Sequence, residues 1–366
     1  MPFVIAVLVI IALMVYLNWR KTPAAKKLDL KLAVVGFEGS GKTVYVGCMF
    51  DRLRIPGAEG IFLHAAPEHA GKLLGLYQKT ADVDAPFPGG TAKGELTEWP
   101  LIVKARSAAG ASEVAKISYL DFAGESLRDI YRAPNPETRQ LHSRFTGADV
   151  LMAVLDGVEV KHFMEDSPGR TFFTDLGTLL ALLSNHQKAA NLILTKWDVL
   201  EKDYTFSQVA GRLLEIDVLA DFVRSQRMVG ACRLLPISSL GQGFVVQEAA
   251  GGMRKQPGKA PNPVRVDLPI ACALPDAVTA AGNRAEEPRF ARAVLAWARA
   301  VSIGVGPFSL GLERDGIQYA QYAMNATSRT PASTAQLIRY CQDRVTRLEA
   351  EFPESDLVRL QLRRGE

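Results

Sequence analysis

Hydrophobic and polar positions alternate where the main part of the chain begins. Leucines at 28, 30 and 32 are separated by Asp29 and Lys31, and an apolar run at 33–35 follows. A period of two that ends in a continuous apolar run predicts a buried β-strand. Similar apolar runs predict five more strands, at residues 100–105, 115–121, 149–155, 191–195 and 232–237.

Helical spacing of apolar residues separates most of these strands. Segments 43–53, 171–184 and 207–225 have the length and spacing of crossover helices, whereas residues 106–114 are predicted to form a short turn. Strands that alternate with such helices form mostly parallel sheets. We therefore expect an α/β fold, with a mostly parallel six-stranded sheet, helices on both faces and one antiparallel hairpin at the edge.

The N-terminal segment has a different character. Residues 1–17 carry no charged side chain, and basic residues follow from position 20 onward. This pattern predicts one transmembrane anchor over residues 1–19, which contacts the lipid bilayer through residues 3–19 and precedes a basic linker at 20–27. The alternatives are a cleaved signal peptide and a packed core helix. A signal peptide usually has basic residues before its apolar run, and this sequence has none there. The positive-inside rule places the N-terminus outside and the remainder in the cytoplasm.

The C-terminal part of the sequence predicts a helical extension. The character of the sequence changes after residue 241, and we expect a main domain at 28–280 and an extension at 281–366. Two amphipathic patterns in the extension predict helices around 288–302 and 334–352. A helix with one apolar stripe is expected to pack on its parent domain rather than on a partner.

Composition and charge exclude several classes of protein. The 366 residues are 48% hydrophobic and 22% charged, which excludes a disordered chain. The net charge of +4 is small and spread along the chain, so no nucleic-acid partner is expected. The four cysteines lie far apart with no CxxC pair, which argues against a disulfide framework and against a zinc site.

The most specific motif directly follows the first predicted strand. Residues 36–43 are Gly-Phe-Glu-Gly-Ser-Gly-Lys-Thr, which matches GxxxxGK[ST] in full, with a strand before it and a helix after it. In such a phosphate-binding loop, backbone N–H groups point at phosphate oxygens, Lys42 reaches the β- and γ-phosphates, and the Thr43 hydroxyl ligates Mg²⁺. The residues predicted to contact the nucleotide here are Gly36, Glu38, Gly39, Ser40, Gly41, Lys42, Thr43 and Val44.

A second phosphate-side element follows the third predicted strand. Residues 121–124 are DFAG and resemble the DxxG segment of GTPases. This resemblance implies that Asp121 holds the Mg²⁺ shell through water and that the N–H of Gly124 bonds the γ-phosphate. Many small GTPases carry Gln at the next position, where this chain has Glu125. A carboxylate there adds like-charge repulsion near the γ-phosphate, so slow intrinsic hydrolysis is expected.

Two further motifs indicate the base. Residues 195–198 are TKWD, which resembles the [NT]KxD motif of GTPases, and residues 238–240 are SSL, which resembles the SA[KL] element with Ser in place of Ala. The Asp198 carboxylate can accept hydrogen bonds from guanine N1–H and the 2-amino group, a pair that adenine does not offer. The residues predicted to contact guanine are Thr195, Lys196, Asp198, Ser238, Ser239 and Leu240.

A switch threonine is expected between the first helix and the second predicted strand. Thr91 is the best candidate because it lies in a segment rich in proline and glycine, residues 86–91, where a mobile loop can bring its hydroxyl to Mg²⁺ and the γ-phosphate. Thr80 and Thr97 are rivals, and a plain surface loop at 86–94 is the alternative interpretation.

The ordered set of four motifs resembles the P-loop GTPase superfamily, of the Ras-like TRAFAC type, over about residues 28–280. Parts of the sequence resemble bacterial double-GTPase families, and the layout is similar to the signal recognition particle receptor beta subunit. The resemblance implies a G domain that binds GTP and Mg²⁺, with metal contacts at Thr43, Thr91 and Asp121. It implies catalytic roles for Lys42, Thr91, Gly124 and Glu125.

The function implied is a membrane-anchored cytoplasmic switch that hydrolyses GTP and signals to an unknown protein effector. The alternative is a slowly hydrolysing or non-hydrolysing GTP-binding scaffold that recruits a partner through its C-terminal helices, and Glu125 favours it slightly. An ATP-driven enzyme is disfavoured by Asp198.

Overall fold

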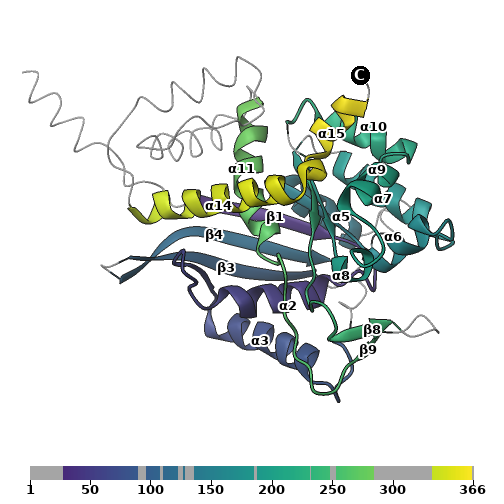
Figure 1. Cartoon of the computed structure of the whole chain (residues 1–366). Helices are drawn as coiled ribbons and strands as arrows, with labels where there is room; N and C mark the ends of the chain where they lie inside the picture. Colours follow the sequence, from purple (N-terminus) through teal and green to yellow (C-terminus); the bar gives the residue numbers. More distant parts are fainter. Residues whose placement is uncertain are drawn as a thin grey trace, which may run out of the picture.

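A seven-stranded sheet forms the centre of the molecule (Figure 1). The computed structural model describes residues 28–89, 96–107, 110–122, 127, 136–184, 188–230, 232–247, 253–283 and 332–364. The strands are β1 (Leu28–Val35), β2 (Ile61–His64), β3 (Leu96–Ser107), β4 (Gly110–Phe122), β5 (Val150–Leu155), β6 (Ala189–Leu194) and β7 (Leu234–Pro236), in the order β2-β3-β4-β1-β5-β6-β7. From β4 to β7 all neighbours are parallel, while β2, β3 and β4 pair antiparallel.

The predicted α/β class and mostly parallel sheet are confirmed, and the predicted number of six strands is wrong. The additional strand is β2, which has only four residues and pairs with β3 at the edge of the sheet. So short a segment shows too little alternation to be recognised as a strand. The edge hairpin is also longer than predicted, because β3 continues to Ser107 and β4 begins at Gly110 where the sequence predicted a turn over 106–114.

Helices cover both faces of the sheet, as predicted. They are α2 (Lys42–Leu53), α3 (Pro67–Ala81), α5 (Pro136–Gly147), α6 (Gly157–Met164), α7 (Phe172–Ser184), α8 (Trp197–Leu200), α9 (Phe206–Leu213), α10 (Asp217–Gln226), α11 (Leu268–Asn283), α14 (Ala332–Glu351) and α15 (Leu357–Arg364). The helix predicted over 207–225 is two helices. Thr205 and Gln208 form a capping box that starts α9, and Ile216 is extended just before α10 begins at Asp217.

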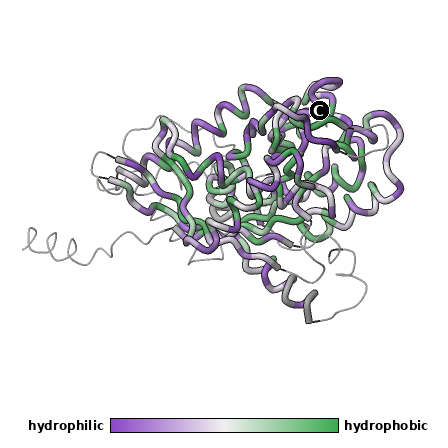
Figure 2. Tube along the Cα trace, turned by 90° about the horizontal axis from the view of Figure 1, so that it is seen from below, coloured by the Kyte–Doolittle hydropathy of each residue, from purple (hydrophilic) through white to green (hydrophobic). Residues whose placement is uncertain are grey.

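The core is divided between the two faces of the sheet because successive side chains of a strand point in opposite directions. Leu30, Leu32 and Val34 of β1 belong to a cluster that includes residues of α2, α11 and α14. Ala33 and Val35 belong to the other cluster, with residues of α6, α7, α9 and α10. Figure 2 shows the hydrophobic positions gathered in the middle of the molecule and hydrophilic ones along its outer helices.

The tail, which is the name used here for residues 332–364, packs back onto the domain. Leu337, Cys341 and Leu348 of α14 are buried, and Figure 1 shows α14 lying beside α11. The short 3₁₀ helix η1 (Pro353–Ser355) then leads to α15. The backbone N–H of Leu357 donates a hydrogen bond to the carbonyl of Cys232 (3.0 Å), directly before β7. The helix predicted around 288–302 lies outside the described residues.

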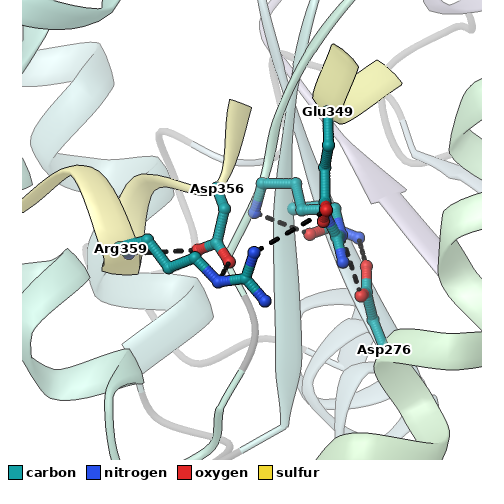
Figure 3. Close-up of polar contacts among 6 residues, drawn as sticks. Asp276, Glu349, Asp356 and Arg359 are labelled. Carbon is teal, nitrogen blue, oxygen red and sulfur yellow. Dashed lines mark hydrogen bonds and ion pairs between the residues drawn. The ribbon is translucent and has the colours of Figure 1, made fainter. Parts of the chain in front are cut away.

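A buried network of polar groups joins the tail to the sheet. The Arg233 guanidinium donates from Nε to Asp276 of α11 (3.0 Å) and from Nη1 to Glu349 of α14 (2.9 Å). Asn191 of β6 donates to the second oxygen of Asp276 (2.8 Å). Figure 3 shows Asp276, Glu349, Asp356 and Arg359 gathered at this point, where Arg359 pairs with both Asp356 and Glu349. These contacts connect β6 and α11 to the two helices of the tail, α14 and α15.

A second, two-stranded sheet forms a hairpin after β7. It pairs β8 (Val245–Gln247) with β9 (Met253–Lys255) in antiparallel fashion. The Lys255 ammonium donates to the carbonyls of Lys79, Asp82 and Ala85, at 2.7 to 2.9 Å, and lies 4.6 Å from the centre of the Phe87 ring. The hairpin therefore holds the end of α3 and the segment that leads toward residue 89.

No helix in the described ranges combines the length and the apolar character that crossing a bilayer requires. The longest described helix, α14, is amphipathic and carries charged residues such as Arg339 and Asp343. The localisation predicted from the sequence is corrected accordingly: the structure does not support a single-pass membrane protein with its N-terminus outside. Residues 1–19 and the linker at 20–27, on which that prediction was based, lie outside the described residues.

Candidate nucleotide-binding site

The predicted site residues follow neighbouring parallel strands and therefore meet at one edge of the sheet. Residues 36–43, called the phosphate loop below, follow β1. Asp121 lies near the end of β4, directly beside Val34 of β1 in the parallel pairing. Residues 195–198 follow β6 and residues 238–240 follow β7; these two are called the base segments. Open α/β sheets bind their ligands at this carboxyl edge.

The phosphate loop has a backbone that requires glycine. Gly39 and Gly41 have φ angles of +79° and +89°, in the left-handed region that side chains disfavour. At Gly36 a Cβ atom would lie 2.8 Å from Val154 Cβ and 3.0 Å from the Val154 carbonyl oxygen. This backbone brings the chain directly into the N-terminus of α2, and a glycine-rich loop that leads into a helix in this way suits an anion.

Lys42 lies inside the phosphate loop. Its Nζ atom donates to the carbonyls of Gly36 (2.6 Å) and Phe37 (3.0 Å), and the residue is only 6% exposed. Burial lowers the pKa of this ammonium, and the charges of Asp121 and Glu38 oppose that shift. The cation is thus already placed where phosphate oxygens would bind.

Ser40 connects the phosphate loop to the first base segment. Its carbonyl accepts a hydrogen bond from Thr195 Oγ1 (2.8 Å), which also lies 3.1 Å from the Leu155 carbonyl. The Ser40 hydroxyl is buried and has no hydrogen-bond partner among the described residues. Buried polar groups are nearly always paired, so this hydroxyl suits a polar ligand in the loop. Thr43 and Val44 follow in the first turn of α2, with their backbone N–H groups at the helix N-terminus.

Lys196 makes a second connection between the two parts of the site. Its Nζ donates to the carbonyl of Gly39 (3.0 Å) and to Oδ2 of Asp156 (2.7 Å). Its φ angle of +52° is unusual for a lysine and sets the turn that begins α8. The first base segment and the phosphate loop are therefore joined directly by hydrogen bonds into one structure.

Asp156 and Gly157 are site residues that sequence reasoning missed. Asp156 accepts a hydrogen bond from the N–H of Val158 (2.9 Å), which caps α6, and pairs with Lys196. A Cβ atom at Gly157 would lie 2.3 Å from the Thr195 carbonyl oxygen, so glycine is needed for β5 and β6 to lead into adjacent turns. The signal available in the sequence was the Asp-Gly pair directly after the predicted strand at 149–155.

Asp198 is held by the second base segment. Ser238 Oγ donates to Asp198 Oδ1 (2.5 Å) and accepts from the N–H of Gly241 (2.9 Å). Burial raises the pKa of the Asp198 carboxyl, and the Ser238 hydrogen bond opposes that shift. Ser239 is buried and Leu240 is half-buried, in the turn that follows Ser238.

Three threonines were considered for the switch, and the structure describes two of them. Thr80 is fully buried within α3, and its hydroxyl donates to the Leu76 carbonyl (2.7 Å), so it is committed to the helix. Thr97 lies opposite Asp121 in the pairing of β3 with β4. Thr91 lies outside the described residues, as do Gly124 and Glu125. Asp121 itself is 2% exposed.

The chain was compared with known proteins. No family model matches it, and no curated protein matches it. Among solved structures it is similar to the GTPase-like domain of Ski7 from S. cerevisiae, bound to GTP, with 12% identity and a TM-score of 0.36 over 68% of this chain and 50% of that chain. It is also similar to the bacterial selenocysteine-specific elongation factor EF-Sec, with 13% identity and a TM-score of 0.27 over 58% of this chain and 26% of that chain. The match thus spans half or less of each of these chains, and it is a likeness of fold alone.

Proposed function

We propose that this chain binds guanine nucleotides and hydrolyses GTP with Mg²⁺, and that it acts as a molecular switch. One observation carries the proposal: the base segment at 195–198 is hydrogen-bonded directly to the phosphate loop, through Thr195 to Ser40 and through Lys196 to Gly39. A single ligand with phosphates at one end and a base at the other fits such a continuous site. In this proposal residues 28–280 form the GTP-binding domain and 281–366 its C-terminal extension.

The base end supports guanine rather than adenine. Asp198 offers a fixed carboxylate, because Ser238 holds one of its oxygens and Trp197 is buried beside it. A carboxylate in this place accepts from the N1–H and the 2-amino group of guanine. Adenine has no such pair of donors, so its binding would leave the buried Asp198 carboxylate with Ser238 but without the two donors of the base, which is costly.

The phosphate end supports a nucleotide with Mg²⁺. In this proposal the anion is bound by the loop N–H groups, by Lys42 and by the Ser40 hydroxyl, which has no hydrogen-bond partner among the described residues. No cluster of three or more His, Cys, Asp or Glu side chains that could hold a metal by themselves occurs in the described ranges. One hydroxyl, Thr43, and one carboxylate, Asp121, are oxygen donors of the kind that Mg²⁺ binds together with phosphates. Bound there, Mg²⁺ would neutralise charge on the β- and γ-phosphates.

The parts that would carry the switch are proposed from the motifs. Thr91 and Gly124 would contact the γ-phosphate end, and loss of that phosphate would release both segments for an effector to detect. Glu125 in place of Gln would make hydrolysis slow without an activator. The recruitment of a partner by the C-terminal helices is less well supported, because the apolar side chains Leu337, Cys341 and Leu348 are buried against the chain's own domain.

Nucleotide binding by the full chain is the direct test. We expect GTP and GDP to bind in the presence of Mg²⁺ with clear preference over ATP, and phosphate to be released slowly from GTP in the same sample. The variant Asp198→Asn should lose about 100-fold or more in GTP affinity, because two charge-assisted hydrogen bonds are lost, and should prefer xanthine nucleotides.

Asp221→Asn is the matched control, since Asp221 is an exposed carboxylate on α10 that pairs only with Arg224 among its described contacts. It should bind GTP like the unmodified protein. Equal affinity for GTP and ATP, or GTP binding that is unaffected in Asp198→Asn, would contradict the proposal. Guanine-selective binding without phosphate release would instead support a non-hydrolysing scaffold.

A further inference from the structure

Phe352, in the tail, packs against the first base segment. Its ring centre lies 6.1 Å from that of Trp197, edge to face, and 4.7 Å from that of Phe206. Trp197 is the residue between Lys196 and Asp198 and is 2% exposed; its ring also lies edge-on to Phe206, at 5.6 Å. The side chain that separates the two base-binding residues is thus enclosed by two phenylalanines, one of which comes from the tail.

The same phenylalanine is connected to the second base segment. The Arg265 guanidinium lies over the Phe352 ring, 4.7 Å from its centre, and pairs with the neighbouring Glu351. Next to Arg265 in the chain, Val264 exchanges two backbone hydrogen bonds with Ser238, at 2.8 and 3.0 Å. Ser238 is the residue that holds the Asp198 carboxylate. Phe352 therefore contacts Trp197 of the first base segment and Arg265, which is next to the residue that pairs with the second base segment.

The tail is fixed on either side of Phe352. On one side, Glu349 accepts from the buried Arg233 (2.9 Å), and on the other, Leu357 bonds the Cys232 carbonyl (3.0 Å). Both Cys232 and Arg233 directly precede β7, the strand that leads to Ser238. Because Phe352 is fixed to the start of this strand, its ring has a defined position relative to the base segments at the strand's end.

We propose that Phe352 is a positioning residue for guanine specificity: the tail holds Trp197 and Arg265 so that Asp198 and Ser238 stay in place to bind the base. The inference rests on the proposed function, since it concerns the same site. Packing around the pair of residues that bind a base must be tight, because a displacement of about 1 Å is enough to lose aligned hydrogen bonds. Without the ring, the α8 turn has room to move toward the vacated space.

Inosine triphosphate provides the discriminating measurement, because inosine keeps N1–H and lacks the 2-amino group. The full chain and the variant Phe352→Ala are compared for their affinities for GTP and inosine triphosphate and for the rate of single-turnover hydrolysis at saturating GTP. We expect Phe352→Ala to lose about ten-fold in GTP affinity, the equivalent of one good hydrogen bond. Its affinity for inosine triphosphate should fall less, so the preference for GTP shrinks, and its hydrolysis rate should stay near that of the unmodified protein.

Phe62→Ala is the matched control. Phe62 is an equally large, half-buried ring on β2, at the opposite edge of the sheet from β6 and β7. Its truncation should lower the melting temperature and leave the ratio of the two affinities unchanged. The proposal is overturned if Phe352→Ala keeps the ratio of GTP affinity to inosine triphosphate affinity of the unmodified protein, whatever its melting temperature.

Two further outcomes are separable. If Phe352→Ala does not fold, Phe352→Leu is measured in its place. A leucine side chain has no flat ring to contact Trp197 and Arg265. An unchanged ratio of GTP affinity to inosine triphosphate affinity in Phe352→Leu would therefore also overturn the proposal. If the unmodified chain binds GTP no better than ATP, the proposed function itself fails, and this is known before any Phe352 variant is measured.

Discussion

The phosphate end and the base end of the site are built in different ways. The phosphate loop is formed by consecutive residues between β1 and α2, and its shape follows from glycines at fixed positions. The base end is assembled from residues 195–198, residues 238–241 and Phe352, which lie far apart in the sequence and meet only in the folded chain. The shape of one end is therefore encoded mainly in one short segment, whereas the other end requires segments from distant parts of the chain.

Cutting the buried network that ties the tail to β7 should have the largest effect. In Arg233→Met, the carboxylates of Asp276 and Glu349 lose their shared partner, and removing one member of a buried ion pair typically costs about 3–5 kcal/mol of unfolding free energy. Chemical denaturation measures this cost. Arg224→Met is the control, because the pair of Arg224 with Asp221 is exposed on both sides and should change stability by less than about 1 kcal/mol. Equal effects of the two variants would mean that the tail is held by other contacts.

A smaller effect is expected from crowding the phosphate loop. In Gly36→Ala the new methyl group meets the Val154 side chain and backbone, and overpacking of this kind costs about 1–3 kcal/mol. GTP affinity should fall together with the melting temperature, because the same backbone forms the anion site. Gly71→Ala places a methyl group where no atom lies within 4 Å, inside α3, and should stabilise the protein by about 0.5–1 kcal/mol. A Gly36→Ala protein that binds GTP normally would show that the loop is less restricted than its geometry indicates.

The smallest effect concerns pH and separates the two ends directly. In the proposed function guanine is bound by the ionised Asp198 carboxylate, and burial raises the pKa of this group above its ordinary value of 3.8. The affinity for GTP relative to ATP should therefore decline on acidification, starting at a higher pH than for an exposed aspartate. GTP and ATP carry the same phosphates, so the titration of the phosphates cancels in the ratio of the two affinities. In Asp198→Asn the ratio of GTP affinity to ATP affinity should not vary with pH. If that variant shows the same decline on acidification, a group other than Asp198 causes the pH dependence.

The same contrast explains what could be predicted from the sequence. The β1 strand, the phosphate loop and the start of α2 were predicted together, because each depends on nearby residues. Asp156, Arg265 and Phe352 were not predicted. The Asp-Gly pair at 156–157 is a local signal for the first, but the sequence does not distinguish the other two from an ordinary surface cation and a core aromatic. Their roles depend on partners that tertiary structure supplies: Lys196 for Asp156, and Trp197 for Phe352.

The helices and strands were also predicted best where the local sequence has a clear pattern. Long segments with clear periodicity, such as 171–184 and 334–352, correspond closely to α7 and α14. The four residues of β2 have no such pattern, and the boundary between α9 and α10 is set by an extended Ile216 inside an otherwise helical stretch. In both cases the pattern of apolar residues does not mark the element or its boundary.

The placement of Phe352 in the tail also has a consequence for how the protein is made. A ribosome synthesises Trp197 and Ser238 long before Phe352, while the phosphate loop emerges among the first segments of the domain. The residues of the loop are therefore available early in synthesis, whereas the Trp197 ring lacks its contact with Phe352 until the tail has emerged and has docked. In the proposed function, the segment that binds phosphate is thus synthesised before the last residue that supports discrimination between bases.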